Sequence, residues 1–111
     1  MNIAIIGGGA SGCVSALRIK MNNPEANVTI FEKNNKLLKK VSTTGNGRCN
    51  LGNINIDSSK YLNPFVIDEM LKAGYKNSSQ EFFEDLGLFT YADEEGRIYP
   101  KSNQAQTVVE L

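Results

Sequence analysis

The chain has 111 residues, close to the usual size of one domain, so its length favours a single core. Its 12 basic and 12 acidic residues cancel, so the net charge gives no reason to expect nucleic acid or a membrane surface as a partner. Histidine is absent, which excludes serine–histidine and cysteine–histidine catalysis and most catalytic zinc sites. No metal site is predicted.

The two cysteines and the N-terminal apolar run indicate the cellular compartment of the protein. Cys13 and Cys49 lack CxxC spacing and are interpreted as reduced thiols. The apolar run 3–6 is too short for a signal peptide or a membrane span. These features predict a cytoplasmic protein with no membrane partner.

The first third of the chain predicts a strand–helix–strand unit. Residues 2–6 form a continuous apolar run, which is typical of a strand buried on both faces. Apolar residues recur at helical spacing over 10–21, and the Asn-Asn-Pro sequence that follows stops this helix. The β-branched and aromatic run 28–31 predicts a second strand ending at Glu32. Such a unit is expected to be parallel and right-handed.

The rest of the chain predicts a shaped loop, short helices and a hairpin. Residues 36–52 are polar and glycine-rich, as in a shaped loop. Pro64 at a first helical position and Gly74 as a terminator predict a helix over 64–73. Three further elements are expected: a short helix ending at Gly87 with the capping box Ser78-Ser79-Gln80-Glu81, a hairpin of 88–91 and 97–99, and the beginning of a helix at 104–111.

Glycines directly after the first predicted strand match the pattern G-x-G-x-x-G. Gly7 allows a tight turn, Gly9 leaves room for a pyrophosphate, and Gly12 lets the helix and strand pack closely, whereas Gly8 has no assigned role. The helix amino terminus then directs free N–H groups at the phosphates. Glu32, twenty residues after Gly12, is placed to accept hydrogen bonds from ribose hydroxyls and disfavours the 2′-phosphate of NADP. This context predicts a dinucleotide site, the alternative being a glycine turn without a ligand.

This fingerprint does not separate FAD from NAD, so a second segment bears on the choice. Residues 39–50, KKVSTTGNGRCN, contain two glycines, an arginine and several hydroxyls. Backbone N–H groups and a guanidinium in such a loop suit contacts to phosphate or to a flavin edge. An ordinary glycine-rich surface loop has the same composition.

At these motifs the chain resembles a family of flavoproteins. Four segments are similar to the BaiN/RdsA-type NAD(P)/FAD-dependent oxidoreductases, also called the aminoacetone oxidase family. They are the start GGGASG, the FEK at the end of the second strand, the segment 39–50 (the GRCN loop) and the later EEGRIYPKSNQAQTVVEL. The resemblance covers the whole chain. The family's loop is usually written GRKxLxSGxGRCNxTN; here Leu38 stands at its first glycine and Leu51-Gly52-Asn53 at its final triplet.

The resemblance implies an α/β fold, namely a partial Rossmann-like FAD-binding domain with a βαβ unit, a glycine-rich loop, helices and a hairpin. It also implies hydride transfer through FAD, with NAD(P)H as a candidate electron donor. No residue is predicted as a catalytic acid or base. The residues implied in cofactor binding are Gly7, Gly9, Ala10, Ser11, Gly12, Glu32, Lys33, Lys40, Thr44, Gly45, Gly47, Arg48, Cys49 and Asn50.

Three side chains invite functional readings that compete with structural ones. Cys49 is interpreted as a small packed residue rather than a redox nucleophile, because no base or resolving thiol accompanies it. Arg97 and Tyr99 are interpreted as parts of a surface salt bridge and a hairpin core rather than as walls of a substrate pocket.

Members of the family are several times longer than this chain. Residues 1–111 are therefore interpreted as the N-terminal portion of an FAD-binding domain, without its inserted second domain and C-terminal segment, and are expected to be inactive alone. The first strand would then be an uncovered sheet edge, open to self-association. Two alternatives stay open, a stand-alone dinucleotide-binding module without catalysis and a fragment of an NAD-dependent dehydrogenase, although the GRCN loop argues against the latter. The small-molecule substrate is not predicted.

Overall fold

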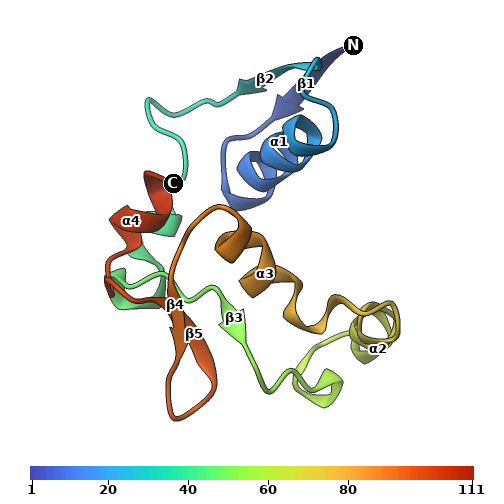
Figure 1. Cartoon of the computed structure of the whole chain (residues 1–111), viewed down its shortest axis with the longest axis vertical. Coiled ribbons are helices and arrows are strands. Elements are labelled where there is room, and N and C mark those ends of the chain that lie inside the picture. The colour runs from blue at the N-terminus through green and yellow to red at the C-terminus, as the bar shows by residue number, and fades with distance from the viewer. The chain divides into compact units, whose positions relative to one another are not determined.

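The computed structural model describes all 111 residues, and they form two compact units, Met1–Thr43 and Thr44–Leu111 (Figure 1). None of the helices is long and apolar enough to cross a membrane. The α-helices are α1 (Ala10–Asn22), α2 (Pro64–Lys72), α3 (Ser78–Asp85) and α4 (Ala105–Val109). The strands are β1 (Asn2–Ile6), β2 (Asn27–Phe31), β3 (Gly52–Asn53), β4 (Thr90–Ala92) and β5 (Arg97–Pro100). Short 3-10 helices cover Ser58–Lys60 and Tyr75–Asn77, and Val41–Gly47 contains 3-10 turns that are interrupted by non-helical residues 44–46.

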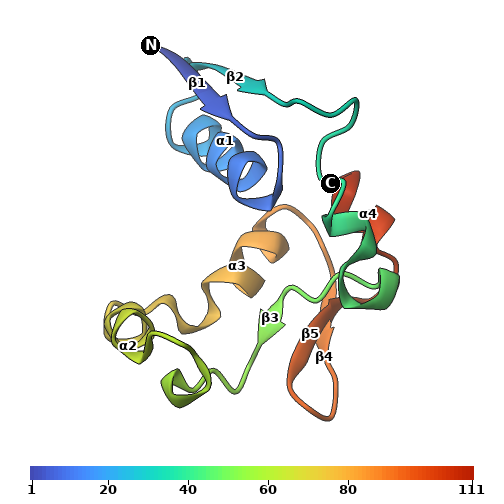
Figure 2. The same ribbon diagram turned by 180° about the vertical axis from the view of Figure 1, so that it is seen from behind.

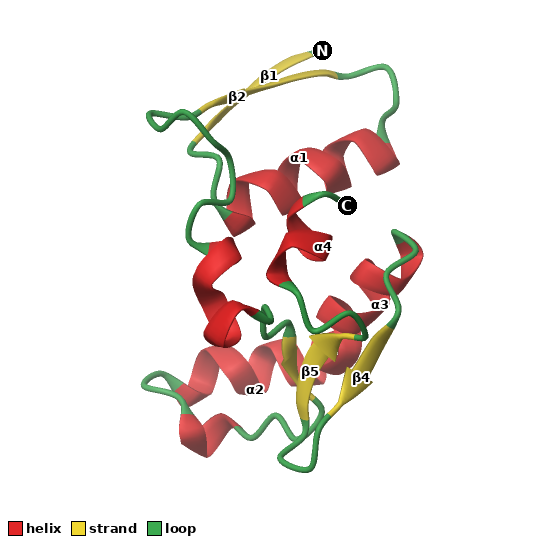
Figure 3. Cartoon of the chain, turned by 90° about the vertical axis from the view of Figure 1, so that its left-hand side faces the viewer, coloured by secondary structure: helices red, strands yellow, loops and turns green.

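The first unit is the predicted strand–helix–strand unit. β1 and β2 pair in parallel, with Ile3 opposite Val28 and Ile5 opposite Ile30. Figure 3 shows α1 running along one side of these two strands. The helix ends at Asn22, and the Asn23 N–H caps it by donating to a helix carbonyl. The predicted parallel pairing and the α/β class are confirmed.

The prediction of a first strand buried on both faces is wrong. Ile3 and Ile5 are half-buried, whereas the alternate residues of β1 are exposed, and Ile6 keeps 83% of its surface. The cause is that one helix covers only one face of a two-stranded sheet. β1 pairs with β2 alone, so its other edge has no strand partner, as expected for an uncovered edge.

The second unit contains a three-stranded antiparallel sheet in the order β3-β5-β4 (Figure 2). β4 and β5 form the predicted hairpin, with Tyr91 opposite Tyr99. β3 was not predicted, because its two residues, Gly52 and Asn53, have no strand-like pattern and pair only through the distant β5. Many of the buried side chains of this unit come from β5 and α4, namely Ile98, Tyr99, Pro100, Ala105 and Val108, and Cys49, Phe82 and Leu88 are buried as well.

In the second unit, the start of α2 and the C-terminal ends of α2 and α3 agree with the prediction, whereas the N-terminus of α3 does not. Pro64 begins α2, while Gly74 and Gly87 have left-handed φ angles of 86° and 89° just beyond α2 and α3. The predicted capping box at the start of α3 is wrong: the Ser78 Oγ donates back to the Tyr75 carbonyl, 3.0 Å away. The 3-10 turn before α3 runs directly into it, so Ser78 already has helical dihedrals and lacks the extended backbone of an N-cap.

Candidate functional site

The glycine turn between β1 and α1 has the backbone geometry that its spacing predicts. Gly7 has φ 99° and donates its N–H to the Phe31 carbonyl at 2.8 Å. A Cβ placed on Gly12 would lie 2.0 Å from the Gly7 carbonyl oxygen, so only glycine allows this approach of helix and turn. A Cβ placed on Gly9 would meet nothing within 4 Å. The tight turn, the close packing and the clear space are thus all present.

Gly8, which the sequence left without a role, is the buried centre of this turn. Its N–H donates to the Glu32 carboxylate at 2.7 Å, and its carbonyl accepts from the Leu38 N–H at 2.8 Å. A Cβ on Gly8 would lie 2.2 Å from Leu37 Cδ2 and 3.3 Å from Glu32 Cβ. Gly8 therefore ties the glycine turn to the segment that follows β2.

Glu32 follows β2 directly, where its position in the sequence predicts it. Its Oε2 accepts from the Gly8 N–H, while its Oε1 accepts from the backbone N–H and the side-chain amide of Asn34 at 2.8 and 2.7 Å. These donors, the Asn34 N–H above all and then the Gly8 N–H, lower the pKa of Glu32 below its usual value. The site thus has an ionised acceptor beside the glycine turn. Asn34 was not predicted, although its i+2 spacing from the carboxylate is a recognisable signal.

The other predicted residues of the first unit have less defined environments. Ala10 and Ser11 are exposed in the first turn of α1. Lys33 and Lys40 are exposed as well, and neither forms an ion pair. Their predicted contacts to a cofactor stay predictions.

Residues 44–50 of the second predicted segment belong to the other unit and form a strongly shaped loop. Gly45, Asn46, Gly47 and Cys49 have left-handed φ angles of 56°, 56°, 81° and 61°. The Cys49 N–H donates to the Thr44 carbonyl at 2.9 Å, which closes the loop. A Cβ on Gly45 would lie 2.7 Å from the Asn50 backbone nitrogen, so the turn requires glycine there for space as well as for φ. The exposed Asn50 accepts the Gly52 N–H through its side-chain oxygen.

Arg48 lies at the centre of this loop and stacks on β5. Its guanidinium carbon is 4.2 Å from the Tyr99 ring centroid, its Nη2 donates to the Tyr99 hydroxyl at 3.3 Å, and its Nε donates to the Gly45 carbonyl at 3.3 Å. Arg48 forms no ion pair with any carboxylate. The loop therefore presents a fixed cation with no internal counter-ion, a suitable partner for an anionic ligand group.

The interpretations of Arg97 as part of a surface salt bridge and of Tyr99 as part of the hairpin core are confirmed, and Tyr99 has one further contact. Arg97 forms ion pairs with Asp93 at 2.7 Å and Glu95 at 3.1 Å. Tyr99 is 2% exposed and belongs to the hairpin core. The sequence did not predict that Tyr99 also supports Arg48, because the two residues are 51 positions apart.

Both cysteines are packed rather than activated. Cys49 is 5% exposed, and burial raises the pKa of its thiol. Burial, and secondarily the charge of Glu32, also raises the pKa of Cys13, whose Sγ lies 3.6 Å from the Gly8 carbonyl. A raised thiol pKa lowers the thiolate fraction, which agrees with the interpretation of Cys49 as a small packed residue.

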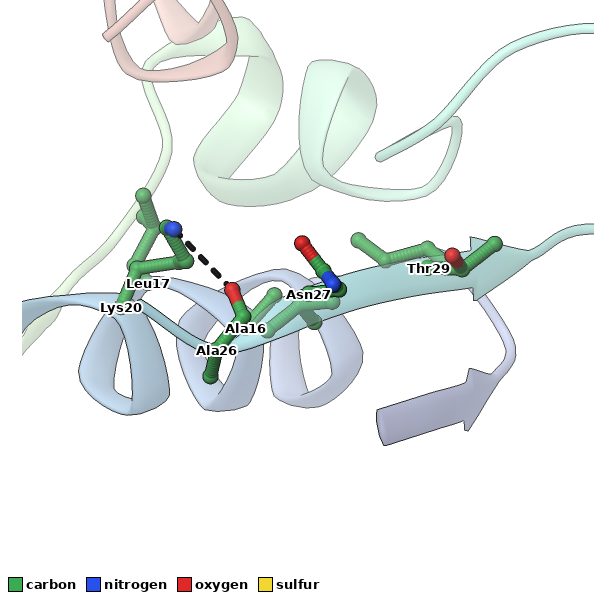
Figure 4. A pocket seen from close by; sticks show the side chains of 8 residues that line it. Ala16, Leu17, Lys20, Ala26, Asn27 and Thr29 are labelled. Carbon is green, nitrogen blue, oxygen red and sulfur yellow. Dashed lines mark hydrogen bonds between the residues drawn. The ribbon is translucent and has the colours of Figure 1, made fainter. Parts of the chain in front are cut away.

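A groove of about 520 Å³ lies between α1 and β2 (Figure 4). Lys20 lines the groove, and its ammonium group already donates a hydrogen bond to the Ala26 carbonyl at 3.0 Å. None of the residues implied in cofactor binding lines this groove. It is therefore separate from the candidate site.

We expect Tyr99→Phe to lower the free energy of unfolding by about 1 kcal/mol, because it removes the hydrogen bond from Arg48 and keeps the ring. In an Arg48→Met background the same change should be neutral or stabilising, since the buried hydroxyl has already lost its partner. Urea unfolding of the four proteins in this double-mutant cycle measures the coupling. Equal effects in both backgrounds would show that the contact contributes nothing to stability.

The parallel β1–α1–β2 unit, with its glycine turn and the acid at the end of β2, defines a Rossmann-type domain, the class of dinucleotide-binding folds. The family model described as "HI0933-like protein Rossmann domain" matches residues 1–111. The chain belongs to this family, which confirms the predicted resemblance. It is also 45% identical over 111 residues to a protein of Clostridium scindens (strain ATCC 35704 / DSM 5676 / VPI 13733 / 19) named 3-dehydro-bile acid delta(4,6)-reductase. That match covers 98% of this chain and 27% of the relative.

Proposed function

We propose that this chain is the N-terminal FAD-binding portion of a flavin-dependent oxidoreductase. The observation that carries the proposal is the arrangement at the glycine turn. The ionised Glu32 carboxylate is held on the Gly8 N–H, and the neighbouring Gly9 leaves its side-chain position open. An acceptor for a ribose hydroxyl beside clear backbone for a pyrophosphate is the chemistry that a dinucleotide requires.

The residues of the first unit fit the adenosine and pyrophosphate half of FAD. Gly7, Gly9 and the first turn of α1 would receive the pyrophosphate, and Glu32 would accept from the ribose. Three hydrogen bonds already occupy the carboxylate, which leaves capacity for one more among its roughly four acceptor positions. This fit by itself supports a dinucleotide in general. It supports FAD in particular only when it is combined with the GRCN loop.

The GRCN loop, the most specific part of the family resemblance, favours FAD over NAD. Arg48 is held in place by Tyr99 and the Gly45 carbonyl and has no carboxylate partner. We infer that this guanidinium contacts the pyrophosphate or the flavin edge. The predicted contacts of Thr44, Gly47, Cys49 and Asn50 belong to the same proposal.

The chemistry that FAD supplies when bound is hydride transfer, with NAD(P)H as the proposed electron donor. The chain's own residues would bind and orient the cofactor, and no residue of the chain is assigned as a catalytic acid or base. The name of the Clostridium scindens relative supports reduction as the direction of the reaction. Because the chain covers 27% of that relative, the substrate-binding walls are proposed to come from sequence outside these residues.

Glu32→Ala tests the proposal in the full-length protein. Losing a hydrogen bond to a charged acceptor should weaken FAD binding roughly ten- to a hundredfold. The wild-type protein should purify with a flavin absorbance spectrum, which bound NAD would not give. Titration of FAD into the apoprotein measures the affinity. Glu25→Ala, which removes an exposed carboxylate that forms no ion pair in the turn before β2, is the matched control. Unchanged affinity in Glu32→Ala would remove this residue from the site.

A further inference from the structure

The geometry points to Asn34 as a positioning residue for the Glu32 carboxylate, an inference that rests on the proposed dinucleotide site. Glu32 lies at the end of β2 without helical or strand backbone beyond it to restrain its side chain. Both of its oxygens are nevertheless fixed. Oε2 accepts from the Gly8 N–H at 2.7 Å, and Oε1 accepts twice from Asn34, at 2.8 and 2.7 Å.

The two contacts from Asn34 have different consequences. The backbone N–H would be retained in almost any residue at position 34, but the side-chain amide donates only because the residue is asparagine. This second donor fills the acceptor capacity of Oε1. The remaining acceptor position of the carboxylate is then on Oε2, next to the Gly8 N–H and on the side of the glycine turn. Asn34 thereby directs Glu32 toward a ligand bound at the turn.

The position after Asn34 supplies a matched control. Asn35 is the same residue type in the same exposed turn, and no hydrogen bond joins it to Glu32. A general effect of shortening an asparagine in this turn would appear in both Asn34→Ala and Asn35→Ala. A positioning effect would appear only in Asn34→Ala.

The ionisation of Glu32 gives a readout that a merely structural role would not change. A ligand hydroxyl donates to the ionised carboxylate, so affinity should fall as the pH falls through the pKa of Glu32. Hydrogen bonds, from the Asn34 N–H first, then the Gly8 N–H and the Asn34 amide, hold that pKa below its usual value, with a further contribution from Lys33. From α1, Cys13 also interacts with the carboxylate. Removing the Asn34 amide should raise the pKa, so binding should be lost at a higher pH.

The experiment is calorimetric titration of the full-length apoprotein with ADP and with FAD across the acid range. Wild type and Asn35→Ala should bind both ligands alike. Asn34→Ala should bind ADP about three- to tenfold more weakly at neutral pH, and the midpoint of its pH dependence should lie higher. Asn34→Ser, whose hydroxyl can donate to the same oxygen, should recover part of both effects.

Each result separates this inference from the proposed function. Failure of the wild type to bind ADP or FAD would overturn the proposed site itself. Wild-type binding with Asn34→Ala equal to Asn35→Ala would overturn the positioning role alone. Weaker binding with an unmoved pH midpoint would overturn it as well, because Asn34 would then act only on the shape of the turn.

Discussion

Replacing Gly9 by valine is expected to abolish FAD retention while leaving the fold intact. A side chain at this position meets no atom of the protein within 4 Å, and the Gly9 dihedrals (φ −80°, ψ −172°) are extended and open to any residue. The protein itself therefore tolerates the substitution, apart from a cost of about 1 kcal/mol for a poor N-cap. A branched side chain would instead fill the space that the proposed site keeps clear for the pyrophosphate.

The measurement is the ratio of flavin absorbance to protein after purification, together with far-UV circular dichroism. Gly9→Ala serves as the smaller step, since one methyl group in the same space should weaken binding less than the valine side chain does. A Gly9→Val protein that purified with stoichiometric flavin would show that the pyrophosphate does not pass this turn.

Gly12→Ala is expected to destabilise the first unit by about 3 kcal/mol, the upper end for overpacking, because its Cβ would lie 2.0 Å from the Gly7 carbonyl oxygen. Intrinsic helix propensity has the opposite sign, favouring alanine over glycine by about 1 kcal/mol inside a helix. The contact wins because the Cβ position is fixed by the helix backbone and the carbonyl oxygen belongs to the backbone of the turn, so neither atom can rotate away. The sign of the result is therefore informative as well as its size.

Urea unfolding measures this difference, with Gly9→Ala as the comparison at an open position three residues earlier. We expect Gly9→Ala to change the free energy of unfolding by much less than Gly12→Ala does. A stabilised Gly12→Ala protein would mean that helix and turn are further apart than the structure shows.

The sequence alone predicted the features that depend on neighbours along the chain. Spacing and residue type suffice to predict features that involve only a few nearby residues. These features are the turn at Gly7, the close packing at Gly12 and the C-terminal ends of α2 and α3. The parallel β1–β2 pair was also predictable, because a strand–helix–strand sequence of this length has few other ways to fold. The position of Glu32 followed from the same unit.

Features that depend on partners distant in the sequence were decided only by the tertiary structure. Gly8 gained its role because the segment after β2 returns to it, and that segment places Leu38 at φ 56°, where the resembling family has glycine. Tyr99 supports Arg48 across 51 residues, and β3 exists only because β5 pairs with it. Burial of β1 was predicted wrongly for the same reason, since a strand's own residues show that it can be buried but not which elements cover it.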